Sequence, residues 1–552
     1  MAFEGQFKSV PVDMSWLSVT FADIFTPLLL CTCLLFAYWL YKTFIQPIRF
    51  YEKRGVPYIK PWTVMMDGLR VTLFQSKLFI DMPKEYYNSY PNERYVGMFQ
   101  MGTPSLVIRD IDLIKQLTIK DFDHFVDHMG FGISQDKDDL FSKNLAAMNG
   151  ETWKEMRTTL SPAFTSSKMK NMFGFMDDCA KNFVRYFQTK KEDVIDVEVR
   201  DVVTKYTNDV IASASFGLKC DTLENPNNEF YEMGQKLTTK SFILMLKFFI
   251  IGCIPDITKL IDIPLFPSEV SKFFRRIVQE TIKTREEQNI IRPDMIHLLM
   301  EAKKGRLQHD SSKTTDAGFA SVEEFNVGKR SANTKMTGDD IAAQALIFFF
   351  GGFDTTATTM SFMALDLAKN PDVQERLQEE IDEVLESTRG NVTYDDVMKM
   401  KYLDQVISET LRMWTPGFQT DRACTKDYVI KPTKPNEKPY LMRKGELIMI
   451  PTLGIHFDPN YFPNPDKFDP DRFSDENKKN IITGTYLPFG VGPRNCIGSR
   501  FALLEIKVYF FRVLSKFSFV FTKNTKLPIK LENVGFHMRP KGGFQMGLKK
   551  RK

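Results

Sequence analysis

The chain has 552 residues, of which 43% are hydrophobic and 26% are charged, so it can bury a substantial core and is not intrinsically disordered. Its net charge of +5 is too small for this length to indicate nucleic-acid binding. The seven cysteines are odd in number and irregularly spaced, which favours a reducing compartment over a disulfide framework.

The N-terminal region predicts a membrane anchor. Residues 24–41 carry no charge, and a segment of about 20 apolar residues crosses a bilayer. A cleaved signal peptide is the alternative, but the preceding residues lack a basic region and no small-residue cleavage site follows. We therefore expect a luminal segment over residues 1–23 and, by the positive-inside rule, a cytosolic main domain, because the nearby basic residues after the span are Lys42, Arg49, Lys53, Arg54 and Lys60.

After the anchor, residues 42–62 predict a hinge that ends in the Pro- and Gly-containing stretch RGVPYIKPW, and residues 63–552 predict one large domain. Apolar periodicity makes this domain mainly α with small β-sheets. Helices are predicted over residues 152–158, 197–216, 273–302, 341–368, 371–386 and 402–413. Short strands are predicted over residues 95–98, 105–108, 428–430 and 446–450.

Two stretches depart from this pattern. Residues 303–340 are polar and irregular, which predicts a mobile surface connection. Residues 241–255 are very apolar but too short to span a bilayer, and Pro255 ends them. They are either a buried helix or a surface that dips into the membrane, and the sequence leaves both interpretations open.

A single cysteine lies in the Gly-rich stretch LPFGVGPRNCIGSR, residues 487–500, and a helical apolar pattern follows it. Cys496 would therefore lie at a helix N-terminus, where backbone N–H groups and the helix dipole favour a thiolate. Gly492 and Gly498 would let the backbone turn tightly and approach a flat ligand, and Arg494 could bind carboxylates. A buried structural cysteine is the competing interpretation.

The flanking residues narrow this choice. The pattern Phe489-x-x-Gly492-x-Arg494-x-Cys496-x-Gly498 resembles the haem-binding signature of the cytochrome P450 monooxygenases. The resemblance implies the cytochrome P450 fold and haem b (iron protoporphyrin IX), with the Cys496 thiolate as the axial ligand of the iron.

Further motifs resemble landmarks of the same family. Glu409-Thr410-Leu411-Arg412 and the later Arg472 are similar to a buried network that braces the haem loop, which is a structural role. Trp153 and Arg157 lie at i, i+4 on a predicted helix, so their side chains should lie together. The resemblance implies that both reach a haem propionate, and it gives the same role to Arg422 and Arg494.

The segment ALIFFFGGFDTTATTM, residues 345–360, breaks helix propensity in the middle of a periodic helix, which often marks a functional site. It resembles the oxygen-binding helix of the family. The resemblance implies that Thr355 hydrogen-bonds dioxygen and that Asp354 relays protons. The cavity-lining residues would be Phe131, Ile347, Phe350, Gly351, Pro416 and Gly417, although Thr415 replaces a proline common in relatives and weakens the inference beside it.

The resemblance is strongest to microsomal members, which implies the endoplasmic reticulum membrane, O2 as co-substrate, and electrons from NADPH through NADPH–cytochrome P450 reductase, with cytochrome b5 as a further candidate partner. The phrase DAGFASVEE, residues 316–324, is most similar to insect members that oxidise xenobiotics. The apolar substrate could instead be a hormone, pheromone or fatty acid. Two competing functions are a haem-thiolate isomerase or dehydratase and a non-enzymatic haem carrier or sensor.

Charged residues and histidines outside these motifs give weaker signals. A basic docking face for an acidic partner is one interpretation of Lys154, Arg500, Lys507, Arg512 and Lys516, and an ordinary charged surface is the other. We expect His456 to make structural hydrogen bonds. We expect His124 and His128 at the surface, and a position lining a substrate loop is the alternative for both.

Overall fold

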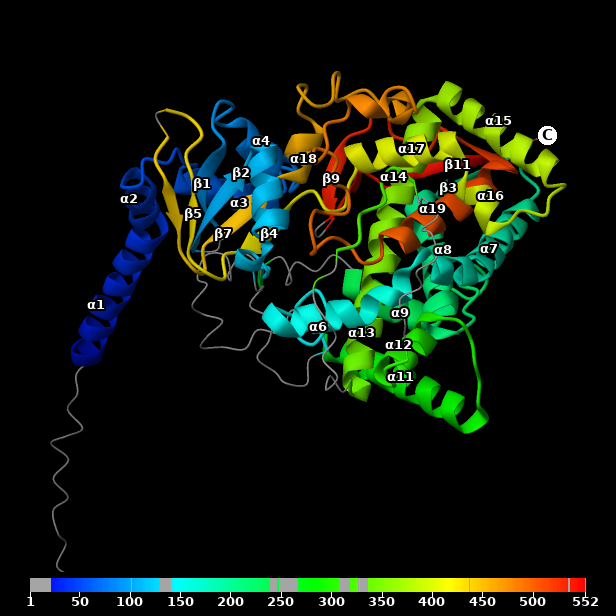
Figure 1. Cartoon of the computed structure of the whole chain (residues 1–552), viewed down its shortest axis with the longest axis horizontal. Coiled ribbons are helices and arrows are strands. Elements are labelled where there is room, and N and C mark those ends of the chain that lie inside the picture. Colours follow the sequence, from blue (N-terminus) through cyan, green and yellow to red (C-terminus); the bar gives the residue numbers. More distant parts are fainter. Residues whose placement is uncertain are drawn as a thin grey trace, which may run out of the picture.

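A computed structural model describes residues 21–100, 102–129, 140–238, 246–247, 267–306, 318–325, 327, 336–435, 437–534 and 537–551 (Figure 1). Helices dominate it and the sheets are small, which confirms the predicted fold class. Phe131 lies outside the described residues, as do residues 241–255 apart from Leu246 and Lys247. The roles predicted for them stay predictions.

The N-terminal helix projects away from the rest of the protein (Figure 1). Helix α1 (Phe21–Leu40) continues through the π-helical turn η2 (Tyr41–Ile45) into α2 (Gln46–Glu52). Among the described residues, this is the one helix long and apolar enough to cross a membrane. The first half of the predicted hinge, residues 42–52, is therefore helical. The π turn lies just before Pro47, which cannot donate a backbone hydrogen bond to the preceding turn.

Tyr51 fixes the end of this helix to the main domain. Its side chain is 1% exposed. Its hydroxyl lies 2.6 Å from the Met98 carbonyl and 2.8 Å from the Ser105 carbonyl, and it accepts the Ser105 N–H at 3.0 Å. A side chain at Gly97 would place its Cβ 2.5 Å from the Tyr51 ring, so glycine is required for this close approach. The second half of the predicted hinge contacts the same strand, because the Gly97 N–H donates to the Pro57 carbonyl and the Ile59 N–H donates to the Gly97 carbonyl, both at 2.8 Å.

The main domain contains the following further helices: α3 (Pro61–Thr72), α4 (Asp81–Asn88), α5 (Ile111–Lys115), η3 (Gln116–Lys120), η4 (Phe122–His124), α6 (Gly150–Leu160), η5 (Ser161–Phe164), α7 (Ser166–Gln188), α8 (Val199–Ile211), η6 (Ala212–Phe216), α9 (Glu229–Thr238), α11 (Ser268–Gln288), α12 (Met295–Lys303), α13 (Gly338–Phe350), η8 (Gly351–Thr355), α14 (Thr356–Lys369), α15 (Pro371–Ser387), α16 (Tyr394–Met398), α17 (Lys401–Met413), α18 (Thr452–His456), η9 (Pro470–Phe473), η10 (Lys478–Asn480) and α19 (Ser499–Leu514). The predicted helix over residues 273–302 is split, because Asn289 adopts a left-handed conformation and Pro293 follows.

In the described part of the chain, short strands form four small sheets. The strands are β1 (Tyr95–Gln100), β2 (Thr103–Ile108), β3 (Val194–Glu198), β4 (Thr420–Ala423), β5 (Tyr428–Ile430), β6 (Tyr440–Met442), β7 (Leu447–Ile450), β8 (Phe517–Val520), β9 (Leu531–Val534), β10 (His537–Pro540) and β11 (Gln545–Lys550). Their orders are β1-β2-β7-β4, β3-β11-β8, β10-β9 and β5-β6. The β2–β7 pair is parallel, with Leu106 opposite Ile448, and the other described pairs are antiparallel.

The centre of the core is α14. Every residue from Thr356 to Ala368 is buried, because α8, α17 and α19 pack around it. A helix buried on all sides needs no amphipathic pattern, which is why threonine and alanine are tolerated throughout. The helix that precedes it, α13, joins it through the π-helical turn η8, and this turn coincides with the segment whose helix propensity is poor.

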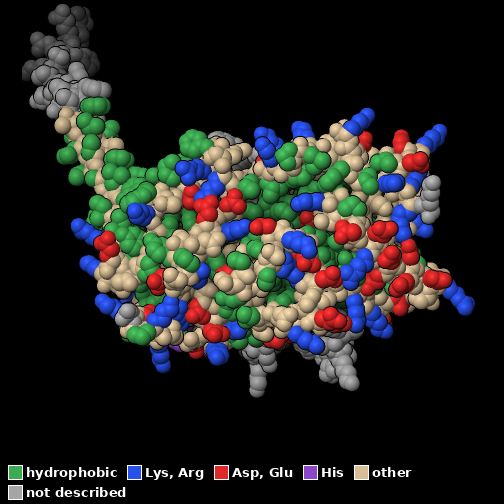
Figure 2. Space-filling view, turned by 90° about the horizontal axis from the view of Figure 1, so that it is seen from above, with side chains coloured by type: hydrophobic (Ala, Val, Ile, Leu, Met, Phe, Trp, Pro, Cys, Tyr) green, Lys and Arg blue, Asp and Glu red, His purple; other side chains and the backbone are tan. Residues whose placement is uncertain are grey.

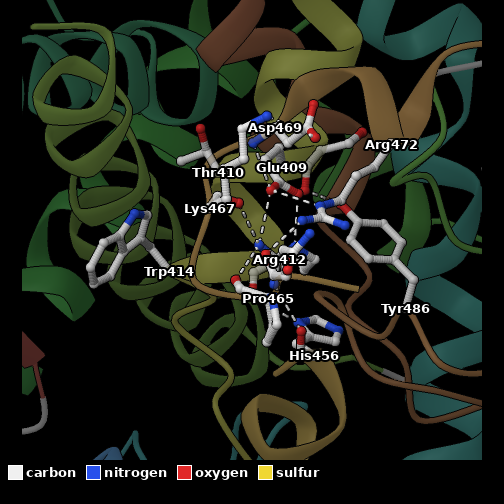
Figure 3. Close-up of polar contacts among 12 residues, drawn as sticks. Glu409, Thr410, Arg412, Trp414, His456, Pro465, Lys467, Asp469, Arg472 and Tyr486 are labelled. Carbon is white, nitrogen blue, oxygen red and sulfur yellow. Dashed lines mark hydrogen bonds and ion pairs between the residues drawn. The ribbon is translucent and has the colours of Figure 1, made fainter. Parts of the chain in front are cut away.

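A buried ionic network lies at the end of α17 (Figure 3). Arg412 donates to both carboxylate oxygens of Glu409, at 2.7 and 2.9 Å, and both side chains are fully buried. Arg472 adds a third contact to the same carboxylate at 3.3 Å, and the Asp469 N–H donates to it at 2.9 Å. Every charge in the network therefore has a partner, which a buried ion pair needs in order to be tolerated.

His456 connects this network to the loop that carries Cys496. Its ring lies 3.0 Å from the Arg412 carbonyl through Nδ1, and its Nε2 accepts the Leu487 N–H at 2.8 Å. Because Nε2 accepts, the ring is neutral and Nδ1 carries the proton. Burial lowers the pKa of His456 from 6.5 to about 3. This histidine makes the structural hydrogen bonds that the sequence predicts for it.

We expect stability to depend on His456 below neutral pH. Because the folded-state pKa is lowered, its contribution is complete above the unfolded pKa of 6.5 and is lost as the pH falls toward 3. The free energy of unfolding should fall by up to about 1.4 kcal/mol per pH unit from this group alone. Chemical denaturation at several values between pH 7 and 5 should give a shallower slope for His456→Gln. Equal slopes would contradict the prediction.

Candidate active site

The loop before α19 is shaped around Cys496. The Cys496 N–H donates to the Phe489 carbonyl, and the Asn495 N–H donates to the Gly492 carbonyl, both at 2.9 Å. Gly492 has φ +71°, and a Cβ there would lie 2.1 Å from the Thr118 carbonyl oxygen, so only glycine fits. Gly498 differs, because its φ of −91° suits any residue and a Cβ there would have no atom within 4 Å. The chain turns at residues 497–498 without a positive φ, and the approach of Gly498 to a flat ligand stays a prediction.

The thiol of Cys496 lies deep in the protein and yet keeps accessible surface. A side chain that is deep in the protein but still accessible faces an internal space, whereas a side chain in the packed core would have no accessible surface. Burial raises its pKa, and the Gly498 N–H and the positive charge of Arg157 only partly oppose that effect. The backbone contribution predicted to favour the thiolate is present but does not dominate. A metal ion bound to sulfur would supply the missing positive charge.

Two buried arginines, Arg422 and Arg494, and the half-buried Arg157 surround this loop. Arg494 donates from Nε to the Val126 carbonyl (2.7 Å) and from Nη2 to the Met148 carbonyl (2.8 Å). Arg422 donates from Nη2 to the Val491 carbonyl at 3.0 Å. Arg157 donates to the carbonyl and the side-chain oxygen of Asn495, at 2.8 and 2.7 Å. The sequence did not single out Asn495, although it lies between two motif positions.

Trp153 lies on the same helix as Arg157, but its neighbour is a different arginine. The guanidinium of Arg494 lies 3.9 Å from the centre of the Trp153 ring, and the indole is buried. Arg494 is a contact of the Trp153 ring that helical spacing does not predict. Spacing along one helix fixes which side chains share a face, whereas a side chain from another segment can still insert between them.

Positive charge in this region exceeds the nearby negative charge. Burial lowers the pKa of Arg157 and of Arg422 to about 10 and the pKa of Arg494 to about 9, and the other two arginines add to the effect on Arg494. Asp421 is engaged by His128 (3.3 Å) and by the Met129 N–H (2.5 Å). His128 is thus half-buried and bonded, and not on the open surface as expected. The site favours an anionic ligand.

The π turn η8 carries the predicted catalytic pair. The Thr355 hydroxyl donates to the Gly351 carbonyl at 2.5 Å. Asp354 is buried and forms an ion pair with Arg200 of α8, which also donates to the Thr358 hydroxyl at 2.5 Å. Arg200 is 154 residues away in the sequence and lies in no recognisable motif, so the sequence offered no signal for it.

The same helix has one partly accessible side. Ile347, Phe350, Gly351 and Thr355 keep some exposure, whereas most of their neighbours are buried. Ile347, Gly351 and Thr355 recur every four residues, and Phe350 lies three residues after Ile347, which places all four on one face. Pro416 is half-buried and Gly417 is exposed at the end of the segment after α17. Thr415 donates to the Pro488 carbonyl at 3.2 Å and so contacts the Cys496 loop.

Comparison with known proteins decides the family. The family model described as Cytochrome P450 matches residues 57–545. This chain belongs to the cytochrome P450 family. It is 43% identical over 519 residues to cytochrome P450 9e2 of Blattella germanica, which covers 91% of this chain and 94% of that protein. It is 41% identical over 512 residues to probable cytochrome P450 9f2 of Drosophila melanogaster, covering 91% and 95%.

A further relative, cytochrome P450 6k1 of Blattella germanica, is 36% identical over 442 residues, covering 79% of this chain and 81% of that protein. The protein is thus a cytochrome P450 monooxygenase, with haem iron as cofactor and O2 as co-substrate. The competing functions without oxygen chemistry, an isomerase or a haem carrier, have no support in these relatives.

The residues of the site fit a haem. Buried Arg422 keeps its Nε without a hydrogen-bond partner, and three cations at one loop, two of them buried, suit a group that carries two carboxylates. Cys496 would hold the iron, and Arg422, Arg494 and Arg157 are the residues whose charge suits the propionates. The haem supplies oxygen activation when bound. The protein supplies the thiolate, the fixed cations and the hydroxyl of Thr355.

We expect Arg422→Gln to weaken haem retention on the order of tenfold or more, because a buried charge partner of a carboxylate is lost. The ratio of haem to protein after dilution and gel filtration measures the effect. Arg443→Gln is a matched control, since it removes one positive charge from an exposed pair with Asp427. Equal haem content in the two variants would contradict the assignment of Arg422.

Proposed function

We propose that this cytochrome P450 inserts one oxygen atom into apolar xenobiotics at the endoplasmic reticulum membrane, with electrons from NADPH delivered by NADPH–cytochrome P450 reductase. The observation that carries the substrate class is the accessible side of the central helix. Ile347 and Phe350 present apolar surface there, and the nearby carboxylate of Asp354 is engaged by Arg200. A substrate with a charged group would find little compensation on this face.

The catalytic roles follow from the π turn. Thr355 presents its hydroxyl on the accessible side, and this hydroxyl donates to the Gly351 carbonyl one turn earlier in the helix. It can therefore donate a hydrogen bond toward the reacting oxygen only by leaving that carbonyl. Asp354 lies next to it and is positioned by Arg200, so it is the group that can exchange a proton with Thr355 through a short relay.

Membrane attachment is supported by two apolar surfaces. The described side chains of α1 are almost all exposed, including Leu28, Leu34 and Leu35. Helix α3 contacts η2 and presents exposed Trp62 and Met66 beside the anchor. Figure 2 shows hydrophobic side chains gathered where the projecting N-terminal helix meets the main domain. The basic residues after the span support a domain on the cytosolic face.

The chain needs an external electron donor. Among the described strands, the single parallel pair joins β2 and β7, which lie more than 300 residues apart and do not form a compact βαβ unit. The described part of the protein thus offers no dinucleotide-binding fold. A reductase that binds NADPH is the donor that microsomal members of the family use, and cytochrome b5 is a second candidate donor.

We expect Thr355→Ala to uncouple electron use from product formation, with product per NADPH reduced severalfold while NADPH consumption continues. Parallel assays of NADPH loss, product and hydrogen peroxide measure the coupling. Thr359→Ala is the control, because it removes a buried hydroxyl one turn further along the same helix. Unchanged coupling in Thr355→Ala would remove the assignment.

The substrate class is tested with the full chain reconstituted with reductase and NADPH in vesicles. A panel of apolar insecticides and plant compounds from different chemical classes should give oxidised products, which mass spectrometry detects. A matched panel of hormones, pheromones and fatty acids should give slower turnover. Faster turnover in the second panel would replace the xenobiotic proposal with an endogenous one. A long-wavelength Soret band of the reduced protein with carbon monoxide must be present first.

A further inference from the structure

Part of the polar connection between α12 and α13 is attached to the Cys496 side of the protein. We call residues 318–325 the strap. The Phe319 N–H donates to the Asp404 carboxylate at 2.9 Å, and Ala320 is buried. The Phe319 ring contacts Phe473 and Tyr486, with ring centres 5.1 and 5.4 Å apart. The prediction of a mobile connection is therefore wrong for the strap.

The first residue of the strap must be glycine for the strap to pass this close to Asp404. Gly318 has φ +105°, and a Cβ there would lie 1.9 Å from the Asp404 carboxylate. Asp404 in turn lies 3.1 Å from Nζ of Lys507, whose side chain is fully buried. Because the carboxylate faces a buried cation and a strap N–H, its position is fixed from two sides.

The other end of the strap contacts residues on both sides of Cys496. The Asn495 side chain donates to the Glu323 carbonyl at 2.7 Å, and Asn495 is itself held by Arg157. Four residues beyond Cys496, Arg500 forms an ion pair with Glu324. The strap thus lies against the segment that carries Cys496 and contacts it through Asn495 and Arg500.

The strap changes the charge of that surface. The side chains of Glu323 and Glu324 are exposed, whereas Arg500 is 13% exposed beneath its partner. The interpretation that Lys507 belongs to a basic docking face is wrong, because its side chain is buried.

The other cations of the predicted docking face are mostly occupied. Arg512 is engaged by Asp177 at 2.5 Å, and Lys154 is engaged by Glu151 at 2.9 Å. Only Lys516 of the five is fully exposed. A simple basic face is therefore not what the structure presents, and Arg500 is the cation that one side-chain rotation would uncover.

We infer that the strap is a built-in acidic competitor for the electron-donating partner. Glu324 occupies Arg500, and an acidic surface of the partner must take its place in order to approach the Cys496 loop. The strap backbone stays anchored through Asp404 and Asn495, so only the Glu324 side chain has to move. The inference rests on the proposed use of a reductase, and the partner it requires is a protein with a carboxylate-rich docking surface.

The test measures binding of the full chain, loaded with haem, to immobilised reductase at low and high salt. Glu324→Gln should lower the Kd about threefold at low salt, since a partly exposed ion pair is a modest competitor. The difference should shrink at high salt. Glu532→Gln is the matched control, because it removes a carboxylate from an exposed pair with Arg539 at 3.0 Å. It should leave the Kd unchanged.

A double variant separates competition from a general charge effect. In the Arg500→Gln background, Glu324→Gln should no longer tighten binding, because the cation for which both carboxylates compete is gone. Unchanged or weaker binding of Glu324→Gln overturns the inference, as does an equal gain with and without Arg500. Failure of the proposed function would be seen separately, as loss of the carbon monoxide Soret band or of peroxide-driven product in the unmodified protein.

Discussion

Charge held inside the protein is the constraint on which the rest of the structure depends. An ion removed from water costs several kcal/mol unless partners replace the water. The protein meets this cost in two ways around Cys496. Glu409 forms ion pairs with both Arg412 and Arg472 on one side of the loop, whereas Arg157, Arg422 and Arg494 are held mainly by carbonyl and amide oxygens. Each cation of the first group has a carboxylate partner, and the second group suits an anionic cofactor.

The helix above the loop shows how a local defect can be kept by global packing. Adjacent glycines and a run of threonines make α13 to α14 a poor helix by propensity, and η8 accommodates them as a π turn. The turn persists because α14 is buried on every side and fixed by α8, α17 and α19. The altered turn places Thr355 on the accessible side while Asp354 faces Arg200. Packing far from the turn thereby determines where its hydroxyl points.

Much of the fold and of the motif positions could be predicted from the sequence, because they depend on short-range pattern. Apolar periodicity located the main helices, and fixed spacings located the loop around Cys496, Glu409 with Arg412, and the turn at Gly351. What could not be predicted involves contacts between distant segments. Arg200 reaches Asp354, and Arg494 covers Trp153, through tertiary packing that no spacing encodes.

The same reason explains the predictions that were wrong. Lys507 reads as a surface cation on an amphipathic helix, but Asp404 from another helix neutralises it in the interior. The strap reads as a polar linker, yet one glycine and one amide attach it to the core. In both cases composition described the residues correctly and failed to identify their partners.

The continuous helix from α1 to α2, fixed by Tyr51 to the first sheet, has a geometric consequence. A rigid stalk transmits rotation. Each residue inserted between Leu40 and Tyr51 would turn the attached domain by about 100° around the stalk and raise it by about 1.5 Å. In the membrane-bound state that we propose, the number of residues in this stalk would set which flank of the domain faces the lipid, although none of these residues belongs to the candidate active site.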